Sequence, residues 1–156
     1  MQTSVTQYGQ AGFAGQIYDT MFTDKMSYSA EGAVPFGAVV RLGTNKERQV
    51  AAVGTGAGQG ALAIGVAVMT YVAEQDAAGN VGYANTQTVS VMKRGRIWVK
   101  TNDPVVAGAA ANLVLSNGTF TDEAVAAGVE AFTAFSAKFI TGTTAAGLAV
   151  VEINPK

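Results

Sequence analysis

The chain has 156 residues and contains neither histidine nor cysteine. The usual general base, the usual thiolate nucleophile and any disulfide are therefore excluded. Charged residues make up 13% of the chain and the formal net charge is −1, whereas an ordinary soluble domain has roughly 25% charged residues. So little charge indicates a structural or binding protein whose surface is largely covered by other protein, rather than an enzyme. The alternative is a monomer with an uncharged polar surface.

The length predicts one domain with a core that needs no covalent staples. The N-terminal stretch MQTSVTQYGQ lacks the basic and apolar regions of a secretion signal. The longest apolar stretch, residues 61–72, is shorter than the roughly 20 residues that a membrane helix needs. We therefore expect no membrane partner.

Residues 1–30 differ in composition from the rest of the chain. They mix Gln, Ala, Gly and Ser with spaced aromatic side chains, and branched aliphatic residues are scarce. The aromatic residues are Tyr8, Phe13, Tyr18, Phe22 and Tyr28. This composition predicts an extended N-terminal arm over residues 1–30, anchored on another surface by its rings, and a folded domain over residues 31–156. The alternative is an irregular segment folded onto its own domain.

From Val34 onward, short runs rich in Val, Ile, Thr, Phe and Trp alternate with breaks rich in Gly, Asn, Asp and Pro. The runs are typical of strands and the breaks of turns. The predicted strands cover residues 37–42, 48–53, 62–72, 86–93, 96–101, 112–115, 119–121, 131–140 and 147–153. We predict an all-β fold, a compact β-sandwich or β-barrel of about eight or nine short strands. Strand spacing does not separate a sandwich from a barrel.

The glycine-rich run of residues 54–60 follows an apolar strand, as a phosphate-binding loop would. A P-loop, however, ends in Gly-Lys-Ser/Thr, and this run ends in Gly60-Ala61. A dinucleotide loop also needs a helix after it, and residues 62–72 alternate as a strand does. The run therefore predicts a mobile hairpin tip and no nucleotide cofactor.

Two local signals lie between residues 112 and 128. Asn117-Gly118 between two predicted strands predicts a hairpin with a two-residue type I′ turn. Residues 122–127 predict one helical turn, because Thr121 is a suitable N-cap and two acidic residues suit the first turn. Gly128 would end that turn.

Charge is sorted along the second half of the chain. Residues 89–101 hold four basic residues and no acid, and residues 103–152 hold five acids and one base. The four bases are Lys93, Arg94, Arg96 and Lys100. Opposed charges of this kind favour self-association or docking on a larger lattice. We interpret the basic cluster as an ion-pair site between subunits rather than a nucleic-acid site, since the chain as a whole is slightly acidic; a solvated strand edge is the alternative.

Two residues inside the basic cluster, Gly95 and Trp98, are expected to have structural roles. Gly95 predicts a bulge that re-aims the arginines on either side of it. Trp98 lies between Ile97 and Val99 and is expected in the core.

No constellation of residues predicts catalysis. The acidic pairs Glu74/Asp76 and Asp122/Glu123 lack metal-ligand spacing and are expected to be solvated in turns. Ser136 and Lys138 share a strand face, but nothing supplies an oxyanion hole. We expect no catalytic residue, no metal and no cofactor.

Five segments together resemble the structural cement proteins, or head decoration proteins, of tailed bacteriophages. They are AGFAGQIYD (11–19), VPFGAVVRLG (34–43), AIGVAV (63–68), VSVMKRGRIWVKTNDPVVAG (89–108) and FITGTTAAGLAVVEIN (139–154). The resemblance follows nearly the whole chain in order. It implies a small β-rich protein of the virion, made in the host cytoplasm and added to the outside of an icosahedral head.

The resemblance also implies a partner. Such proteins bind the major capsid protein across boundaries between neighbouring subunits as symmetric homo-oligomers, for which we favour a trimer over a dimer. From the local composition we expect Phe13, Tyr18 and Phe22 to anchor the arm, and Arg94 and Arg96 to make polar contacts with a neighbour. A receptor- or glycan-binding β module displayed on the virion is the alternative function. A small esterase or nuclease is the least supported, because it would have to work without His or Cys.

Overall fold

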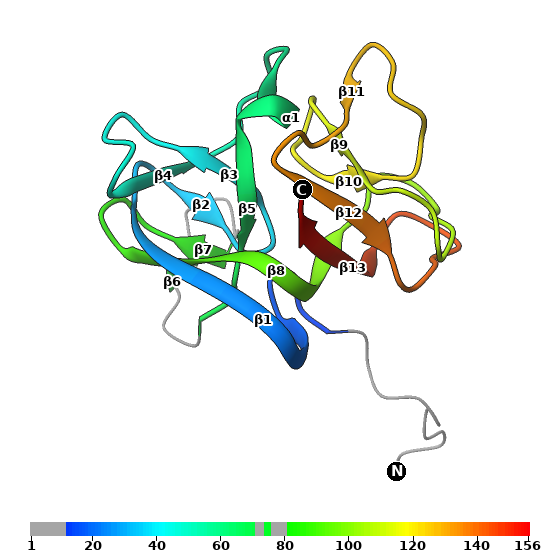
Figure 1. The fold of residues 1–156 in the computed structure, drawn as a ribbon, viewed down its shortest axis with the longest axis horizontal. Coiled ribbons are helices and arrows are strands. Elements are labelled where there is room, and N and C mark those ends of the chain that lie inside the picture. Colours follow the sequence, from blue (N-terminus) through cyan, green and yellow to red (C-terminus); the bar gives the residue numbers. More distant parts are fainter. Residues whose placement is uncertain (1–11, 71–73, 76–80) are drawn as a thin grey trace.

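The computed structural model describes residues 12–70, 74–75 and 81–156 (Figure 1). Its regular structure is β apart from one helical turn of four residues, so the predicted all-β class is confirmed. The elements in chain order are β1 (Ile17–Ala30), β2 (Val34–Pro35), β3 (Val39–Leu42), β4 (Gln49–Ala52), α1 (Gln59–Leu62), β5 (Ala63–Ala67), β6 (Glu74–Gln75), β7 (Val81–Tyr83), β8 (Thr88–Lys100), β9 (Asn112–Val114), β10 (Phe120–Thr121), β11 (Val129–Glu130), β12 (Phe135–Phe139) and β13 (Leu148–Pro155). In the described residues no helix is long and apolar enough to cross a membrane.

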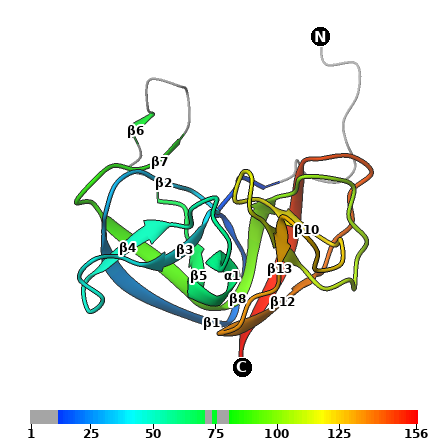
Figure 2. The same ribbon diagram turned by 90° about the horizontal axis from the view of Figure 1, so that it is seen from above.

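Five strands close into a ring. β1 pairs with β4, β4 with β3, β3 with β5, β5 with β8, and β8 pairs back with β1. Figure 2 shows this ring on one side of the molecule, with β2 and β7 beside it. Its apolar cluster, the barrel core, contains Tyr28, Ala30, Val34, Phe36, Val40, Val50, Ala67, Tyr83, Val89 and Val91. This half of the chain is therefore a small barrel.

The other half is built on the far end of β8. There β13 pairs with β8 and β12 pairs with β13, while β9, β10 and β11 form a separate small sheet. A second core joins the two sheets and includes Val39, Met92, Ile97, Val99, Leu113, Phe120, Phe132, Phe135, Phe139, Val151 and Ile153. The ring of Phe132 lies 4.5 Å from that of Phe135 and 5.7 Å from that of Phe120, between centroids. Aromatic packing of this kind adds to the area that the rings bury.

β8 belongs to both halves, and Gly95 divides it. Val91 lies in the barrel core, whereas Met92 and Ile97 both lie in the second core. Met92 and Ile97 are an odd number of residues apart, and side chains of a regular strand alternate with period two. The strand must therefore contain one irregular step. Gly95 has a φ of 134° and the register with β1 shifts beside it, which confirms the predicted bulge.

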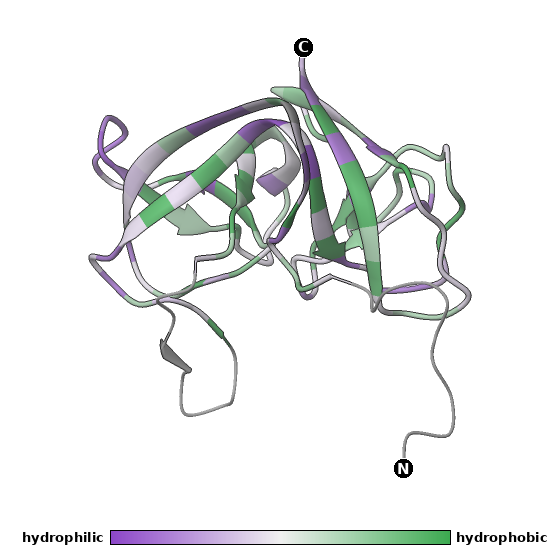
Figure 3. Cartoon of the chain, turned by 90° about the horizontal axis from the view of Figure 1, so that it is seen from below, coloured by the Kyte–Doolittle hydropathy of each residue, from purple (hydrophilic) through white to green (hydrophobic). Residues whose placement is uncertain are grey.

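The step at Gly95 also explains why 13 consecutive residues form one strand where the pattern predicted two, 86–93 and 96–101. Figure 3 shows hydrophilic and hydrophobic residues in alternating bands along the long strands. Without the step, the even-numbered residues after Met92, which include Arg96 and Trp98, would face the second core. The bulge places Ile97 and Val99 there instead.

Residues 17–30 lie in the sheet, whereas the composition assigned them to an arm. They form β1, which pairs with β8 along its length and with β4 at its end. Branched aliphatic residues are scarce there because many side chains of β1 are exposed, and Ile17, Tyr28 and Ala30 supply the packing. Backbone pairing rather than side-chain burial holds this strand. Residues 1–11 of the predicted arm lie outside the described residues.

Seven other predicted strands correspond to β3, β4, β5, β9, β10, β12 and β13, although most of them are shorter than predicted. The hairpin between β9 and β10 is confirmed, but its turn type is wrong. A type I′ turn needs positive φ at both central residues. Here Gly118 alone of the pair has one, at 69°, and the loop covers residues 115–118.

The helical turn predicted over residues 122–127 is wrong. Asp122 accepts a hydrogen bond from the amide of Val106 at 2.8 Å, and the carbonyl of Glu123 accepts one from Asn112 at 2.7 Å. These groups therefore tie distant loops together instead of starting a helix. The Oγ1 of Thr121 accepts from the amide of Glu123, two residues on, which closes a turn rather than caps a helix.

Candidate functional site

Three of the five predicted contact residues come together where β1 and β8 are both irregular. Asp19 is paired with Arg96 and Asp24 with Arg94, so residues 20–23 of β1 stand opposite Gly95 alone. We call residues 20–23 the β1 bulge. It carries Phe22 and brings it beside the two arginines.

The backbone of the β1 bulge is held from both ends. Thr23 Oγ1 donates to the carbonyl of Asp19 at 3.3 Å, which closes the loop. Below the loop, a Cβ on Gly95 would lie 3.3 Å from the same hydroxyl, so the glycine gives the bulge its room. Phe22 has a φ of 59°, in the left-handed region, and 70% of its surface is exposed. A bulky residue rarely adopts that backbone conformation.

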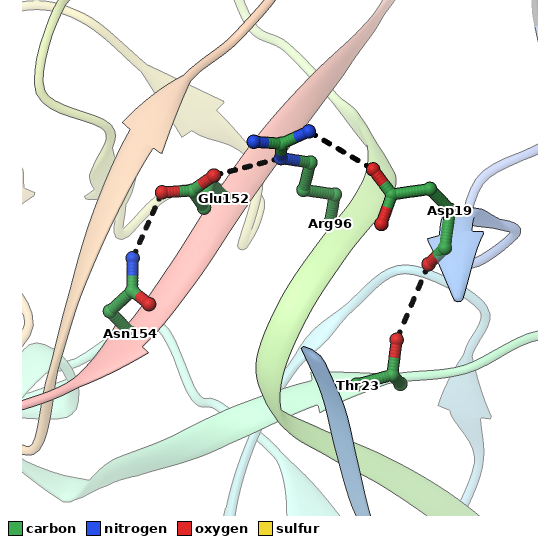
Figure 4. Close-up of polar contacts among 5 residues, drawn as sticks. All are labelled: Asp19, Thr23, Arg96, Glu152 and Asn154. Atoms are coloured by element: carbon green, nitrogen blue, oxygen red, sulfur yellow. Dashed lines mark hydrogen bonds and ion pairs between the residues drawn. The ribbon is translucent and has the colours of Figure 1, made fainter. Parts of the chain in front are cut away.

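Arg96 links three segments beneath the bulge (Figure 4). Its Nη1 contacts Asp19 Oδ2 at 3.0 Å and its Nε contacts Glu152 Oε2 at 2.8 Å. Asn154 donates to the other oxygen of Glu152 at 3.1 Å. The Arg96 guanidinium, and then Asn154, hold the pKa of Glu152 below its ordinary value. The same bonds, first to Glu152 and then to Asp19, raise the pKa of Arg96.

Arg94 has a different environment from Arg96. It is exposed, and its guanidinium carbon lies 5.8 Å from the centroid of the Phe22 ring. Both salt bridges found in the described residues are made by Arg96, so Arg94 has no carboxylate partner among them. An open hollow of about 220 Å³ lies at this place. It is lined by Asp19, Phe22, Arg94, Gly95, Arg96, Glu152 and Asn154.

The ion pairs of Arg96 are made within one chain, whereas the sequence indicated ion pairs between subunits. The pattern missed Asp19, Glu152 and Asn154. Glu152 stood in the acidic excess of residues 103–152, which pointed to opposed charges but not to this pair. The pairing of β13 with β8 is what places Glu152 opposite Arg96.

Phe13 and Tyr18 lie nearer the start of the described chain. Phe13 is 67% exposed, and Tyr18, 48% exposed, has its ring edge-on to Trp98 at 6.0 Å between centroids. Trp98 is half-buried and belongs to neither core, contrary to its predicted place. All three aromatic residues predicted as contacts, Phe13, Tyr18 and Phe22, are thus exposed.

The glycine-rich run of residues 54–60 leads into α1, the helical turn that the pattern did not predict. The amides of Gly58 and Gly60 donate to the two carboxylate oxygens of Glu130, at 2.6 and 2.7 Å. Backbone amides are the donors that a phosphate would use. Because Glu130 already accepts from both, the loop is tied to β11 and offers them to no ligand.

The other chemistry-bearing residues remain scattered. Within the described part of the chain, no three acidic residues are grouped closely enough to hold a metal ion. Ser136 and Lys138 are both exposed on β12, and the Ser136 hydroxyl donates to the carbonyl of Asn154 at 3.3 Å. Of the pair Glu74/Asp76, Asp76 lies outside the described residues.

Comparison with known proteins places the chain in a family. The family model described as "Structural cement protein (E217 gp24/Pam3 gp6)" matches residues 1–154. The chain belongs to this family of structural cement proteins. Its fold is similar to a chain in the structure titled "The capsid of Myoviridae Phage XM1", with a TM-score of 0.69 and 16% sequence identity over 97% of this chain and 96% of that one. A search of curated proteins returned no match.

The resemblance noted in the sequence is thereby confirmed. A cement protein has a structural role in the phage capsid, and the virion is its location. The family is a structural one rather than a class of enzymes. At 16% identity the XM1 chain supports the fold alone, which agrees with the two-cored β architecture described above.

Proposed function

We propose that this cement protein decorates the outside of an icosahedral phage head and bridges neighbouring subunits of the major capsid protein. We also propose that it does so as a symmetric homo-oligomer, a trimer in preference to a dimer. The observation that carries the proposal is the match to a family of structural cement proteins over residues 1–154, nearly the whole chain.

The surface of the molecule supports a bridging role. Phe13, Tyr18 and Phe22 are exposed along one stretch of chain, and with Arg94 they remain our proposed direct contacts to a neighbour. Arg96, which binds Asp19 and Glu152, contributes by holding that surface in place. Aromatic side chains and Arg are enriched where protein interfaces gain most of their binding energy. A chain that is only 13% charged also loses little solvation when its surface is covered.

Bridging stabilises a shell because every bridge must break before the subunits part. Many equivalent weak contacts then act as one multivalent clamp. The two cores share β8, so a force applied to one half is carried through covalent backbone to the other.

The test uses heads assembled without this protein. Adding the full chain should fill equivalent positions over the whole shell, visible by cryo-electron microscopy, and should raise the temperature at which the heads release DNA. Heads mixed with serum albumin are the control. Full occupancy without any rise in the release temperature would exclude cementing.

The same images separate the alternative function. A receptor- or glycan-binding module would occupy a few copies at a vertex or on the tail, whereas a cement protein occupies the entire shell. Bound copies confined to one vertex would favour the receptor-binding alternative.

A further inference from the structure

Phe22 has an unfavourable backbone conformation, and packing of its side chain in either core does not offset this cost. Its φ of 59° is unfavourable for a bulky side chain, and its ring is 70% exposed. Strained residues in folded proteins cluster at functional sites, where the side chain contacts a ligand or a partner. The ring meets the Arg94 guanidinium and belongs to neither core.

The surrounding residues hold Phe22 in this position. Arg96 fixes Asp19, the residue before the β1 bulge, and Thr23 closes the bulge onto the carbonyl of Asp19. Asp24, the residue after it, is in register with Arg94. The bulge is therefore clamped at both ends, and the ring is presented outward on a fixed support.

The two arginines near the Phe22 ring differ in their ion pairing. The carboxylates of Asp19 and Glu152 both bind Arg96, so their charge faces that guanidinium. Arg94 lies over the aromatic ring of Phe22 and forms no salt bridge with a carboxylate of the described residues. An exposed cation stacked on an exposed aromatic ring complements a partner that offers a carboxylate beside an apolar recess.

The geometry points to the β1 bulge as the docking element for the major capsid protein: Phe22 enters an apolar recess there and Arg94 pairs with a carboxylate at its rim. Arg96, with Asp19 and Glu152, is a positioning residue that holds the bulge and does not itself touch the partner. This inference rests on the proposed function and adds the chemistry of the contact.

Binding of the full chain to undecorated heads tests the contact. Phe22→Asn removes the ring but suits the left-handed backbone, since Asn adopts that region more readily. We expect it to melt at or above the wild-type temperature and to bind heads about thirtyfold or more weakly, as for a central aromatic anchor. The matched control is Val106→Asn, at a valine of similar exposure, 68%, in the other half of the molecule; it should bind as the wild type does.

Arg94→Gln tests the charge. It should weaken binding about tenfold or more, as loss of a charge-assisted contact does, and reduce the dependence of binding on salt. Arg48→Gln makes the same change at an exposed arginine between β3 and β4 and should leave binding unaltered. If Phe22→Asn or Arg94→Gln binds heads like the wild type, the β1 bulge is not the docking element.

Positioning by Arg96 has its own readout. Arg96→Gln should weaken binding, and combining it with Phe22→Asn should weaken binding no further than Phe22→Asn alone, because Arg96 acts through the ring. Additive losses would show that Arg96 acts independently and would overturn its positioning role.

Two further outcomes are decisive. If the variants change the oligomeric state in solution rather than head binding, the bulge joins copies of this chain, and the capsid partner is wrong. If the wild-type chain itself does not bind heads, the proposed function fails. If the wild type binds and the variants bind equally well, the proposed function stands and the docking inference fails.

Discussion

At the scale of single residues, Arg94 and Arg96 show how the same side chain takes two roles two positions apart. Arg96 binds two carboxylates of its own chain, whereas Arg94 lies over an exposed ring. The difference comes from β13 and β1, which bring Glu152 and Asp19 to Arg96. A charge count along the chain treats both arginines alike, because it does not contain those pairings.

The Glu152 carboxylate predicts a pH effect with a definite sign. Hydrogen bonds from Arg96 and then Asn154 lower the pKa of Glu152 below its ordinary 4.5. A carboxyl with a lowered folded-state pKa stabilises the fold above the pKa of the unfolded chain, and that stability is lost as the pH falls through the folded-state pKa. The stabilisation by ionised Glu152 is therefore complete at neutral pH, and it is lost in acid, below pH 4.5.

Glu152→Gln should accordingly melt at a lower temperature than the wild type at pH 7. Its free energy of unfolding should be lower by about 1 kcal/mol or less, since the ion pair is partly exposed. The difference should shrink as the pH is lowered through the acid window. Melting curves of both proteins from pH 7 downward provide the measurement. A difference that stays constant into strong acid would mean that the ionised carboxylate is not the stabilising group.

At the scale of elements, β8 carries the architecture. One strand of 13 residues supplies side chains to both cores, and the step at Gly95 places Ile97 and Val99 in the same core as Met92. The step also provides the site, because the β1 bulge fits over the same glycine. Fold and candidate docking surface thus depend on one backbone irregularity.

Gly95→Ala tests that dependence. A Cβ there would need a φ of 134° and would lie 3.2 Å from Met92 Sδ and 3.3 Å from Thr23 Oγ1. We expect the free energy of unfolding to fall by about 1–3 kcal/mol, as for other residues in sparsely populated backbone regions.

Gly56→Ala is the matched control, because nothing lies within 4 Å of the added Cβ. Its free energy of unfolding should change by no more than about 0.5 kcal/mol. Urea titration gives both values. If the two alanine variants unfold alike, β8 does not depend on glycine at position 95.

At the scale of the whole molecule, β1 is part of the folded body. Ile17 packs against the second core and is in register with Ile97, while the end of β1 closes the barrel through β4. Removing the first 25 residues would therefore remove part of the fold as well as part of the predicted arm. Truncation from the N-terminus has to respect this boundary.

A chain that begins at residue 12 should unfold at nearly the same urea concentration as the full chain, since it keeps Ile17 and the Asp19–Arg96 bridge. A chain that begins at residue 26 should be less stable by about 1 kcal/mol or more, because it loses the partly buried Ile17 and the Asp19–Arg96 bridge. Equal midpoints for the two truncated chains would show that the first half of β1 contributes nothing to stability.

The sequence predicted the β class because branched and aromatic runs between Gly, Asn and Pro breaks are a local property of the chain. It found the β9–β10 hairpin and the step at Gly95 for the same reason, and its segments in order matched the cement family. It failed over residues 122–127, where the side chain of Asp122 bonds to Val106 rather than to its own turn. It also failed at β1, whose pairing with β8 requires no apolar pattern of its own.

By itself, then, the amino-acid order determined the secondary-structure class, most strand positions, the family and the absence of His and Cys chemistry. Only the tertiary structure decided that five strands close into a barrel, that Arg96 is bound within the chain, and that Phe22 stands outward beside Arg94. The physical reason is that composition and spacing act between neighbours along the chain. Strand pairing and ion pairing join residues as far apart as Asp19, Arg96 and Glu152, and no local pattern records which of them meet.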